Sequence, residues 1–257
     1  MSKSVFSVCG ALFAALVTLF STQSPAAAGD KVVVSTPALH SLVATLLEGV
    51  GTPALLFSNK DALSDPVPDA DALAAIEAAE MVIWAGPEYE QALAGIRTLD
   101  ASIGFKSLTL SATTPLISMS EAGNADRPSG RHDMRFWLDP RLAKLAVSRI
   151  ASNLVRVYPD GGDRILDNEI VLKKRLAALE KSMRDALDAP HGAPVHVPES
   201  DILYLAWRFN LEAPNCPAAA AKIEAFGQTA GIDLYFAMMA QVLEDLQRCR
   251  PANRPAS

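Results

Sequence analysis

The chain has 257 residues, half of them hydrophobic, and its 23 basic and 29 acidic side chains give a formal net charge of −6. An acidic chain is a poor partner for the phosphate backbone, so we expect no nucleic-acid binding. The apolar half of the composition is enough for a packed core, which excludes intrinsic disorder for most of the length.

The first 28 residues have the pattern of a cleaved secretory signal peptide. They hold one Lys and no acid, then the apolar run "VFSVCGALFAALVTLF", and end in "SPAAAGD" with small residues at Ala26 and Ala28. The run has about 16 residues, whereas a spanning helix needs about 20. We therefore expect cleavage after Ala28, export, and no transmembrane segment in the mature chain.

The mature chain would keep two cysteines, Cys216 and Cys249. Export to an oxidising compartment favours a disulfide between them. The alternative is two thiols too far apart to meet.

Strand and helix patterns alternate along the first half of the mature chain. Short apolar runs predict buried strands, and segments with apolar residues at helical spacing predict helices between them. The predicted strands are "VVV" at 32–34, "ALLFS" at 54–58, "MVIWAG" at 81–86 and "SLTLS" at 107–111, with helices over 37–48 and 71–80. This order predicts an α/β lobe with a parallel sheet over residues 29–160.

The second half is predicted to be mostly helical. Residues 119–133 are polar and read as a mobile loop. Asp139 and Pro140 should start one helix, and the pattern from Asp163 to about Asp188 predicts another of roughly 26 residues, about 39 Å long. Residues 161–189 would therefore be a rigid inter-lobe helix, and 190–257, with a last helix over 232–249, a smaller carboxy-terminal lobe.

Four blocks of sequence resemble the periplasmic zinc- and manganese-binding receptors of ABC importers. They occur in family order and include "VVVSTPALHSLVATLLEGVG", "AAEMVIWAGPEYEQAL", "FWLDPRLAKLAVSRIASNLVRVYP" and "YLAWRFNLE". The resemblance implies two α/β lobes with parallel sheets joined by a long rigid helix. It also implies a metal in the cleft between the lobes, a monomer in the periplasm, an ABC permease in the inner membrane as partner, and no catalysis.

In this family three His and one carboxylate usually bind the metal, and two of these positions lack a usable ligand here. Ser64 stands where the first His is expected, and its neutral hydroxyl is a weak donor. Arg135 stands at the second His position, two residues before the Trp of "WLDP". A guanidinium has no lone pair to give and stays protonated, so it repels a cation.

The remaining two positions keep oxygen donors. The resemblance puts Glu199 at the third His position and Glu224 at the carboxylate position, with a second lobe shortened between them. His132 could add a ligand if its segment turned inward, although a strand would place it on the opposite face from Arg135. His40 is expected to be a packing residue.

Two hypotheses follow for the cleft. In the first, the protein binds zinc or another divalent metal weakly on Glu199, Glu224 and His132. In the second, the fold is kept as a metal-independent accessory or interaction protein, with no metal if the site is fully degenerate. Arg135 then pairs with Glu199 and Glu224 or binds an anionic ligand. No phosphate loop, hydrolase elbow or zinc-protease motif occurs in the sequence, so no enzymatic activity is expected.

Overall fold

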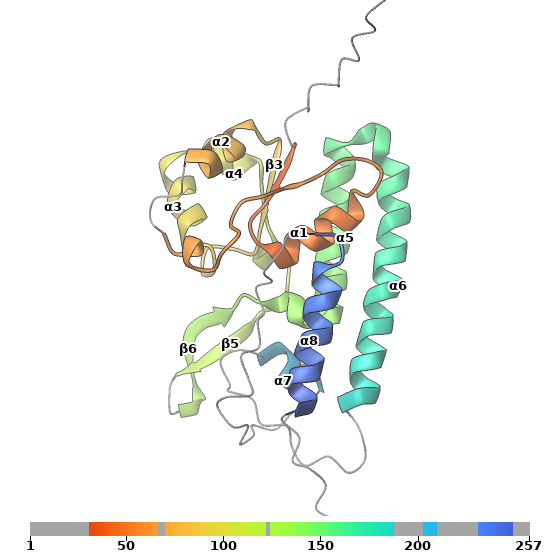
Figure 1. Cartoon of the computed structure of the whole chain (residues 1–257). Coiled ribbons are helices and arrows are strands. Elements are labelled where there is room, and N and C mark those ends of the chain that lie inside the picture. The colour runs from red at the N-terminus through yellow and green to blue at the C-terminus, as the bar shows by residue number, and fades with distance from the viewer. Residues whose placement is uncertain (1–30, 66–69, 122–123, 188–202, 210–230, 249–257) are drawn as a thin grey trace, which may run out of the picture.

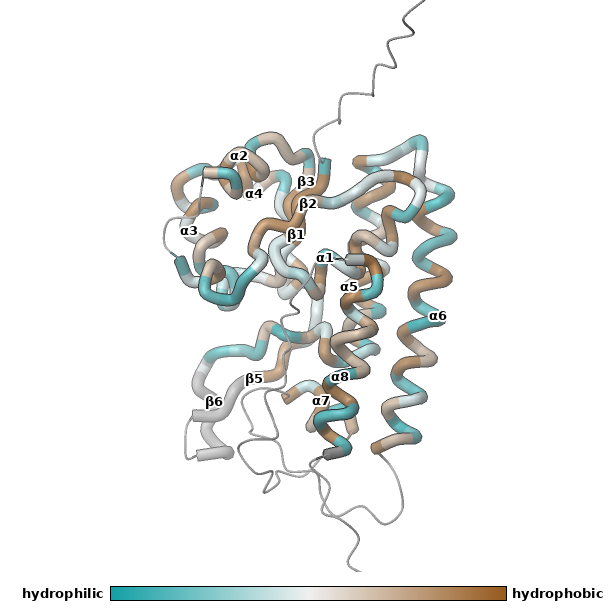
Figure 2. The backbone as a smooth tube through the Cα atoms, in the orientation of Figure 1, coloured by the Kyte–Doolittle hydropathy of each residue, from teal (hydrophilic) through white to brown (hydrophobic). Residues whose placement is uncertain are grey.

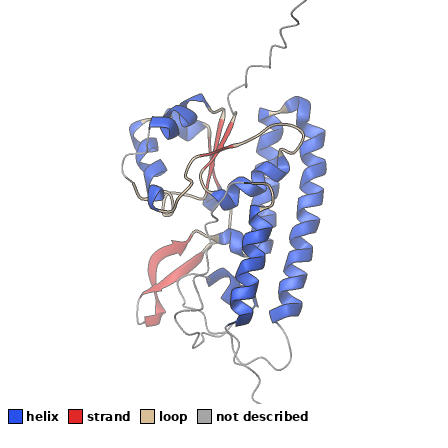
Figure 3. Cartoon of the chain, in the orientation of Figure 1, coloured by secondary structure: helices blue, strands red, loops and turns tan. Residues whose placement is uncertain are grey.

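The computed structural model describes residues 31–65, 70–121, 124–187, 203–209 and 231–248, and these form a mixed α/β fold (Figures 1 and 3). Its centre is a four-stranded sheet in the order β2-β1-β3-β4, with every neighbouring pair parallel. The strands are β1 (Val32–Val34), β2 (Ala54–Leu55), β3 (Met81–Trp84) and β4 (Ser107–Thr109). The predicted parallel sheet is confirmed; β1 has the expected length, and the other three strands are shorter than expected.

The two faces of this sheet belong to two separate hydrophobic clusters. Successive strand residues point to opposite faces, so Val32 and Val34 pack on one side while Val33 packs on the other. The first face is covered by α1 (Pro37–Leu46) and the helices behind it. The second face is covered by α2 (Ala70–Ala78), α3 (Gln91–Leu99) and α4 (Ser102–Phe105), as Figure 1 shows.

Two long helices stand beside the sheet, joined by the short turn η4 (Pro159–Gly161). They are α5 (Pro140–Val157) and α6 (Gly162–Leu187). Asp139 caps α5 by accepting a hydrogen bond from the amide of Arg141, and Pro140 occupies the first helical position, where its missing N–H costs nothing. The predicted start of α5 and the 26-residue length of α6 are both confirmed.

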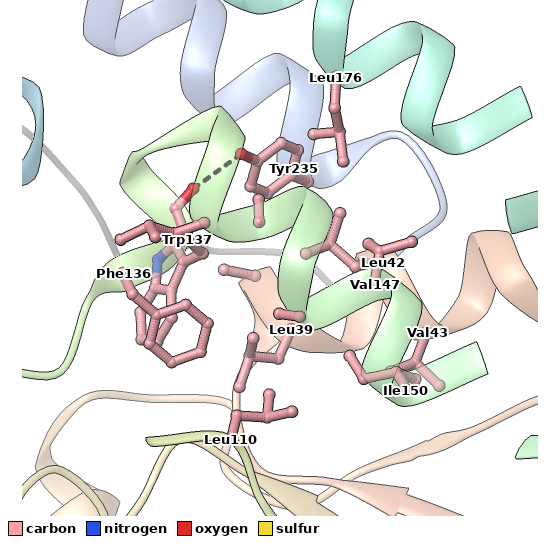
Figure 4. Packing of buried hydrophobic residues seen from close by; sticks show 14 of the residues in the cluster. Leu39, Leu42, Val43, Leu110, Phe136, Trp137, Val147, Ile150, Leu176 and Tyr235 are labelled. Atoms are coloured by element: carbon pink, nitrogen blue, oxygen red, sulfur yellow. Dashed lines mark hydrogen bonds between the residues drawn. The ribbon is translucent and has the colours of Figure 1, made fainter. Parts of the chain in front are cut away.

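The last helix, α8 (Leu234–Arg248), completes the larger cluster by packing against α1 and α6. Figure 4 shows how the buried Tyr235 reaches the segment before α5, where its hydroxyl donates to the carbonyl oxygen of Trp137 at 2.7 Å. In Figure 2 the strands of the parallel sheet are hydrophobic, and hydrophobic and hydrophilic residues alternate along α6. No helix among the described ranges is long and apolar enough to cross a membrane.

The polar stretch predicted to be a mobile loop is instead an antiparallel hairpin. It consists of β5 (Ile117–Glu121) and β6 (Asn124–Asp133), with two irregularities in register. The loop prediction was wrong because composition reports side-chain polarity, whereas an antiparallel pair is held by backbone hydrogen bonds and can face water.

The region predicted to be a carboxy-terminal lobe, residues 190–257, is described only in part. The described residues beyond α6 form α7 (Leu203–Phe209) and α8. The second parallel sheet, predicted for residues 190–257, falls largely on positions outside the described ranges.

Candidate functional site

The carboxyl edge of the parallel sheet is where a ligand crevice is expected. The chain leaves β1 for β2 on one side and β3 for β4 on the other, so the strand order reverses between β1 and β3. Open α/β sheets bind ligands outside the carboxyl ends of the strands at this point. Here these ends are Ser35, after β1, and Ala85 and Gly86, after β3.

Glu90 ties the two strand ends together. Its Oε1 accepts hydrogen bonds from the Ser35 hydroxyl at 2.6 Å and the Ala85 amide at 3.0 Å, and its Oε2 accepts one from the Gly86 amide at 2.8 Å. The residue is fully buried. Burial raises the pKa of the Glu90 carboxyl to about 7, although these three donors act in the opposite direction.

The segment that follows β6 packs directly against this edge. Gly86 has a φ of +151°, and a Cβ there would lie 2.3 Å from Ser111 Oγ and 2.7 Å from Met134 Cε. A larger residue at position 86 would therefore displace the side chains of Ser111 and Met134. The close approach places the residues around Met134 at the crevice.

Arg135, the residue predicted to stand at the second ligand position, is paired with Asp133. Its Nε donates to Asp133 Oδ1 at 2.9 Å, its Nη2 donates to Oδ2 at 3.0 Å, and its own backbone amide also donates to Oδ1 at 2.9 Å. The Asp133 side chain is 2% exposed and that of Arg135 is 14% exposed. Both oxygens of the Asp133 carboxylate therefore accept hydrogen bonds from the Arg135 guanidinium, in a bidentate arrangement.

Tyr204 of α7 fixes the same segment from the carboxy-terminal side. Its hydroxyl donates to the carbonyl oxygen of Asp133 at 2.6 Å and accepts from the amide of Ile117 at 3.2 Å. Burial raises the pKa of Tyr204 to about 12, so the hydroxyl keeps its proton at neutral pH. One turn later, Arg208 donates from Nε to Asp139 Oδ2 at 2.8 Å. Two contacts therefore join α7 to the ends of the segment 133–139.

The other predicted site residues are dispersed. Ser64 is exposed at the end of the short turn η1 (Asp61–Leu63). His132 is bonded to Glu88, which accepts from its amide at 2.8 Å and lies 3.1 Å from its Nδ1. His40 is buried, with Nε2 2.9 Å from the carbonyl oxygen of Pro53, which confirms its packing role.

Four predicted residues lie outside the described ranges, and their roles stay predictions. They are Glu199 and Glu224 of the cleft, and Cys216 and Cys249 of the disulfide. The partner described for Arg135 is instead Asp133, which the sequence analysis did not consider. A signal was present, because a strand period of two places residues 133 and 135 on one face.

Within the described ranges, no group of three or more His, Cys, Asp or Glu is arranged to hold a metal. A hollow of about 600 Å³ does occur, but at the opposite edge of the sheet, lined by Lys31, Tyr158 and Arg164 among others. Lys31 is already paired with Glu80 at 2.9 Å, and of the predicted ligands that the structure describes, none lines this hollow. Arg135, which the sequence analysis selected, instead follows Met134 at the carboxyl edge of the sheet.

A family model described as "Zinc-uptake complex component A periplasmic" (ZnuA) matches residues 32–230. The chain belongs to the ZnuA family. Its relatives include the high-affinity zinc uptake system protein ZnuA of Brucella abortus, which is 25% identical over 79% of this chain and 71% of the relative. The ZnuA of Yersinia pestis is 27% identical over 64% of this chain and 58% of its own length.

Solved structures show the same fold. The laminin-binding protein Lmb of Streptococcus agalactiae, described as an adhesin with metal-transporting activity, superposes with a TM-score of 0.67 at 17% identity. It is covered completely by 86% of this chain. AdcAII of Streptococcus pneumoniae gives a TM-score of 0.58 at 22% identity, with 73% of this chain and 68% of AdcAII covered. The expected resemblance and fold class are both confirmed.

Proposed function

We propose that the protein is the solute-binding component of an ABC importer for a divalent metal, with zinc as the favoured cargo, and that its metal site is degenerate. Membership of the ZnuA family and relatives named for zinc uptake support the importer role. The proposal includes export to the periplasm after cleavage at Ala28, an inner-membrane permease as partner, and no catalysis.

The observation that carries the degenerate site is the pair of Asp133 and Arg135. Zinc needs about four N, O or S donors at 2.0 to 2.3 Å, and Arg135 offers none. Its guanidinium also occupies both oxygens of Asp133, the nearest described carboxylate. Because Asp133 balances the charge of Arg135, the repulsion of a cation is weaker than for a lone guanidinium. We attribute weak binding mainly to missing donors.

The cleft would then depend on Glu199, Glu224 and His132. Glu88 supports this role for His132, because a ring nitrogen held by a carboxylate leaves the other nitrogen oriented toward a metal. We further propose the organisation given above: a lobe at 29–160, the inter-lobe helix at 161–189 and a shortened lobe at 190–257. A disulfide between Cys216 and Cys249 would stabilise that short lobe.

The same pair also favours a second candidate, an accessory protein that has kept the fold without the metal. A buried carboxylate and a guanidinium that satisfy each other need no cation between them. An anionic ligand of Arg135 would have to compete with Asp133, which holds two of its nitrogens. Within this second candidate, an accessory protein whose Arg135 binds no ligand is therefore favoured over one whose Arg135 binds an anion.

Calorimetric titration of the mature protein with zinc distinguishes the two candidates. We expect weak binding that strengthens at least about tenfold, or 1.4 kcal/mol, in Arg135→His, which adds a donor and releases Asp133. Arg135→His combined with Ser64→His should strengthen it further. The matched control is Arg149→His, on the exposed side of α5, which should leave zinc affinity unchanged.

Three results are decisive. Weak binding in the unmodified protein and a gain in Arg135→His support the degenerate importer component. No binding in the unmodified protein, with binding in the double variant, favours the accessory protein. Nanomolar binding that Arg135→His does not change would place the site elsewhere and overturn the assignment of Arg135.

A further inference from the structure

We infer that Glu90 is a positioning residue for the candidate cleft: its proton controls how firmly the loop Gly86–Glu90 holds the segment 132–135. This role rests on the proposed function only in that the segment contains Arg135 and His132. It concerns the chain without metal, and can be tested without zinc.

The geometry of Glu90 is unusual for its position. It is the N-cap residue of α3, but its carboxylate makes no capping bond to that helix. It turns back instead to the sheet, where it accepts from Ser35, Ala85 and Gly86. A single buried carboxylate thus joins the two strand ends on either side of the switch point.

The same loop reaches the hairpin through its outer residue, Glu88. Both oxygens of Glu88 contact His132, one through the amide and one through the ring. On the inner side, Gly86 packs against Met134. The loop therefore holds residues on both sides of Asp133, and loosening it would free the segment that places Arg135.

Burial, rather than a neighbouring charge, makes Glu90 sensitive to pH. Burial raises the pKa of Glu90, and its hydrogen bonds to Ser35, Gly86 and Ala85 act against that increase. Charged groups on the surrounding described elements have other partners: Asp133 and Arg135 pair with each other, and Arg97 of α3 lies over the ring of Trp84.

Two further titratable groups on these elements are His40 of α1, at Pro53, and His132, at Glu88. The amide of His132 is the main cause that lowers the pKa of Glu88, so Glu88 is ionised throughout the neutral range. Glu90 is therefore the carboxyl of this loop that changes its charge near pH 7.

The direction of the effect follows from linkage. Opening the loop returns Glu90 to water and to its ordinary pKa of 4.5, whereas the closed loop holds it at about 7. Between these values the closed loop keeps a proton that the open loop loses, so raising the pH favours opening. The loop should be closed most firmly at and below about pH 4.5, loosen up to about pH 7, and change little above that.

Amide hydrogen exchange of the mature protein from pH 5 to pH 8, corrected for intrinsic exchange rates, tests this role. Protection of Ala85 and Gly86 should fall about tenfold per pH unit up to about pH 7 and then level off. The amide of His132, held by the same loop, should follow. In Glu90→Gln these slopes should vanish, whereas Glu80→Gln, which removes a half-exposed acid paired with Lys31, should keep them.

Several results would overturn the proposal. Slopes that persist in Glu90→Gln would assign the effect to another group, such as His132. An equal slope at the buried α5 amides would mean that Glu90 acts on the whole fold. If Glu90→Gln does not fold, the carboxyl ¹³C titration of Glu90 in the unmodified protein decides, since a midpoint near 4.5 instead of about 7 removes the basis of the inference.

Discussion

Two aspartate–arginine pairs lie at the two ends of the segment 133–139, and they differ in which parts of the chain they connect. Asp133 pairs with Arg135, two residues away, and Asp139 pairs with Arg208, 69 residues away. In both, the carboxylate is almost fully buried and the arginine is 14% exposed. The two pairs are therefore similarly buried, but one joins near neighbours in the sequence and the other joins distant residues.

One pair holds distant parts of the architecture together, and the other shapes the candidate site. The Asp139 pair joins α7 to the start of α5, so it links α7 to the core. The Asp133 pair joins neighbours on one strand end and links no distant elements by itself. Its main consequence is local: it puts a satisfied ion pair at the position where the resemblance predicts a metal ligand.

The largest expected effect comes from breaking the long-range pair. Arg208→Met leaves the charge of Asp139, which is 0% exposed, with the amide of Arg141 but without its cation. Breaking a buried pair in this way costs about 3 to 5 kcal/mol. Urea denaturation should show this loss, while Arg149→Met on the exposed side of α5 should change stability by less than about 0.5 kcal/mol. A loss as small as the control's would mean that α7 is not held by this pair.

A smaller loss is expected from the local pair. Arg135→Met leaves Asp133 buried with one backbone donor, which should cost about 1.5 to 3 kcal/mol because the lost hydrogen bonds were charge-assisted. Adding Asp133→Asn should recover part of it, since a buried neutral amide is less costly than an unpaired charge. A double-mutant cycle by chemical denaturation measures the coupling, and additive losses would contradict a specific pair.

The smallest effect is expected at the hydrogen bonds that join Tyr204 of α7 to the two strands of the hairpin. Tyr204→Phe removes the donor to the carbonyl oxygen of Asp133 and the acceptor for the amide of Ile117, while keeping the ring. We expect a loss of about 1 kcal/mol and faster amide exchange at Ile117. Unchanged exchange at Ile117 would show that the hairpin is held by other contacts.

Much of the fold could be predicted from the sequence because it follows from local periodicity. The buried run at Met81 and the helical pattern after Asp163 specify β3 and α6 with little help from distant residues. The hairpin at 117–133 was not predicted in this way, since β6 lacks an alternating apolar pattern and is joined to β5 by backbone pairing.

For the site, the sequence supplied a prediction of which residues occupy the ligand positions, including Arg135 where the resemblance implies a histidine, and that assignment stays a prediction. The sequence by itself determined the start of α5, because Asp139 and Pro140 act on the adjacent helical turn. Only the tertiary structure decided that Arg135 satisfies Asp133 and that Glu90 is buried between β1 and β3. The physical reason is that the charge state and hydrogen bonds of a side chain depend on which atoms exclude water from it. Those atoms come from strands and helices that are distant in sequence.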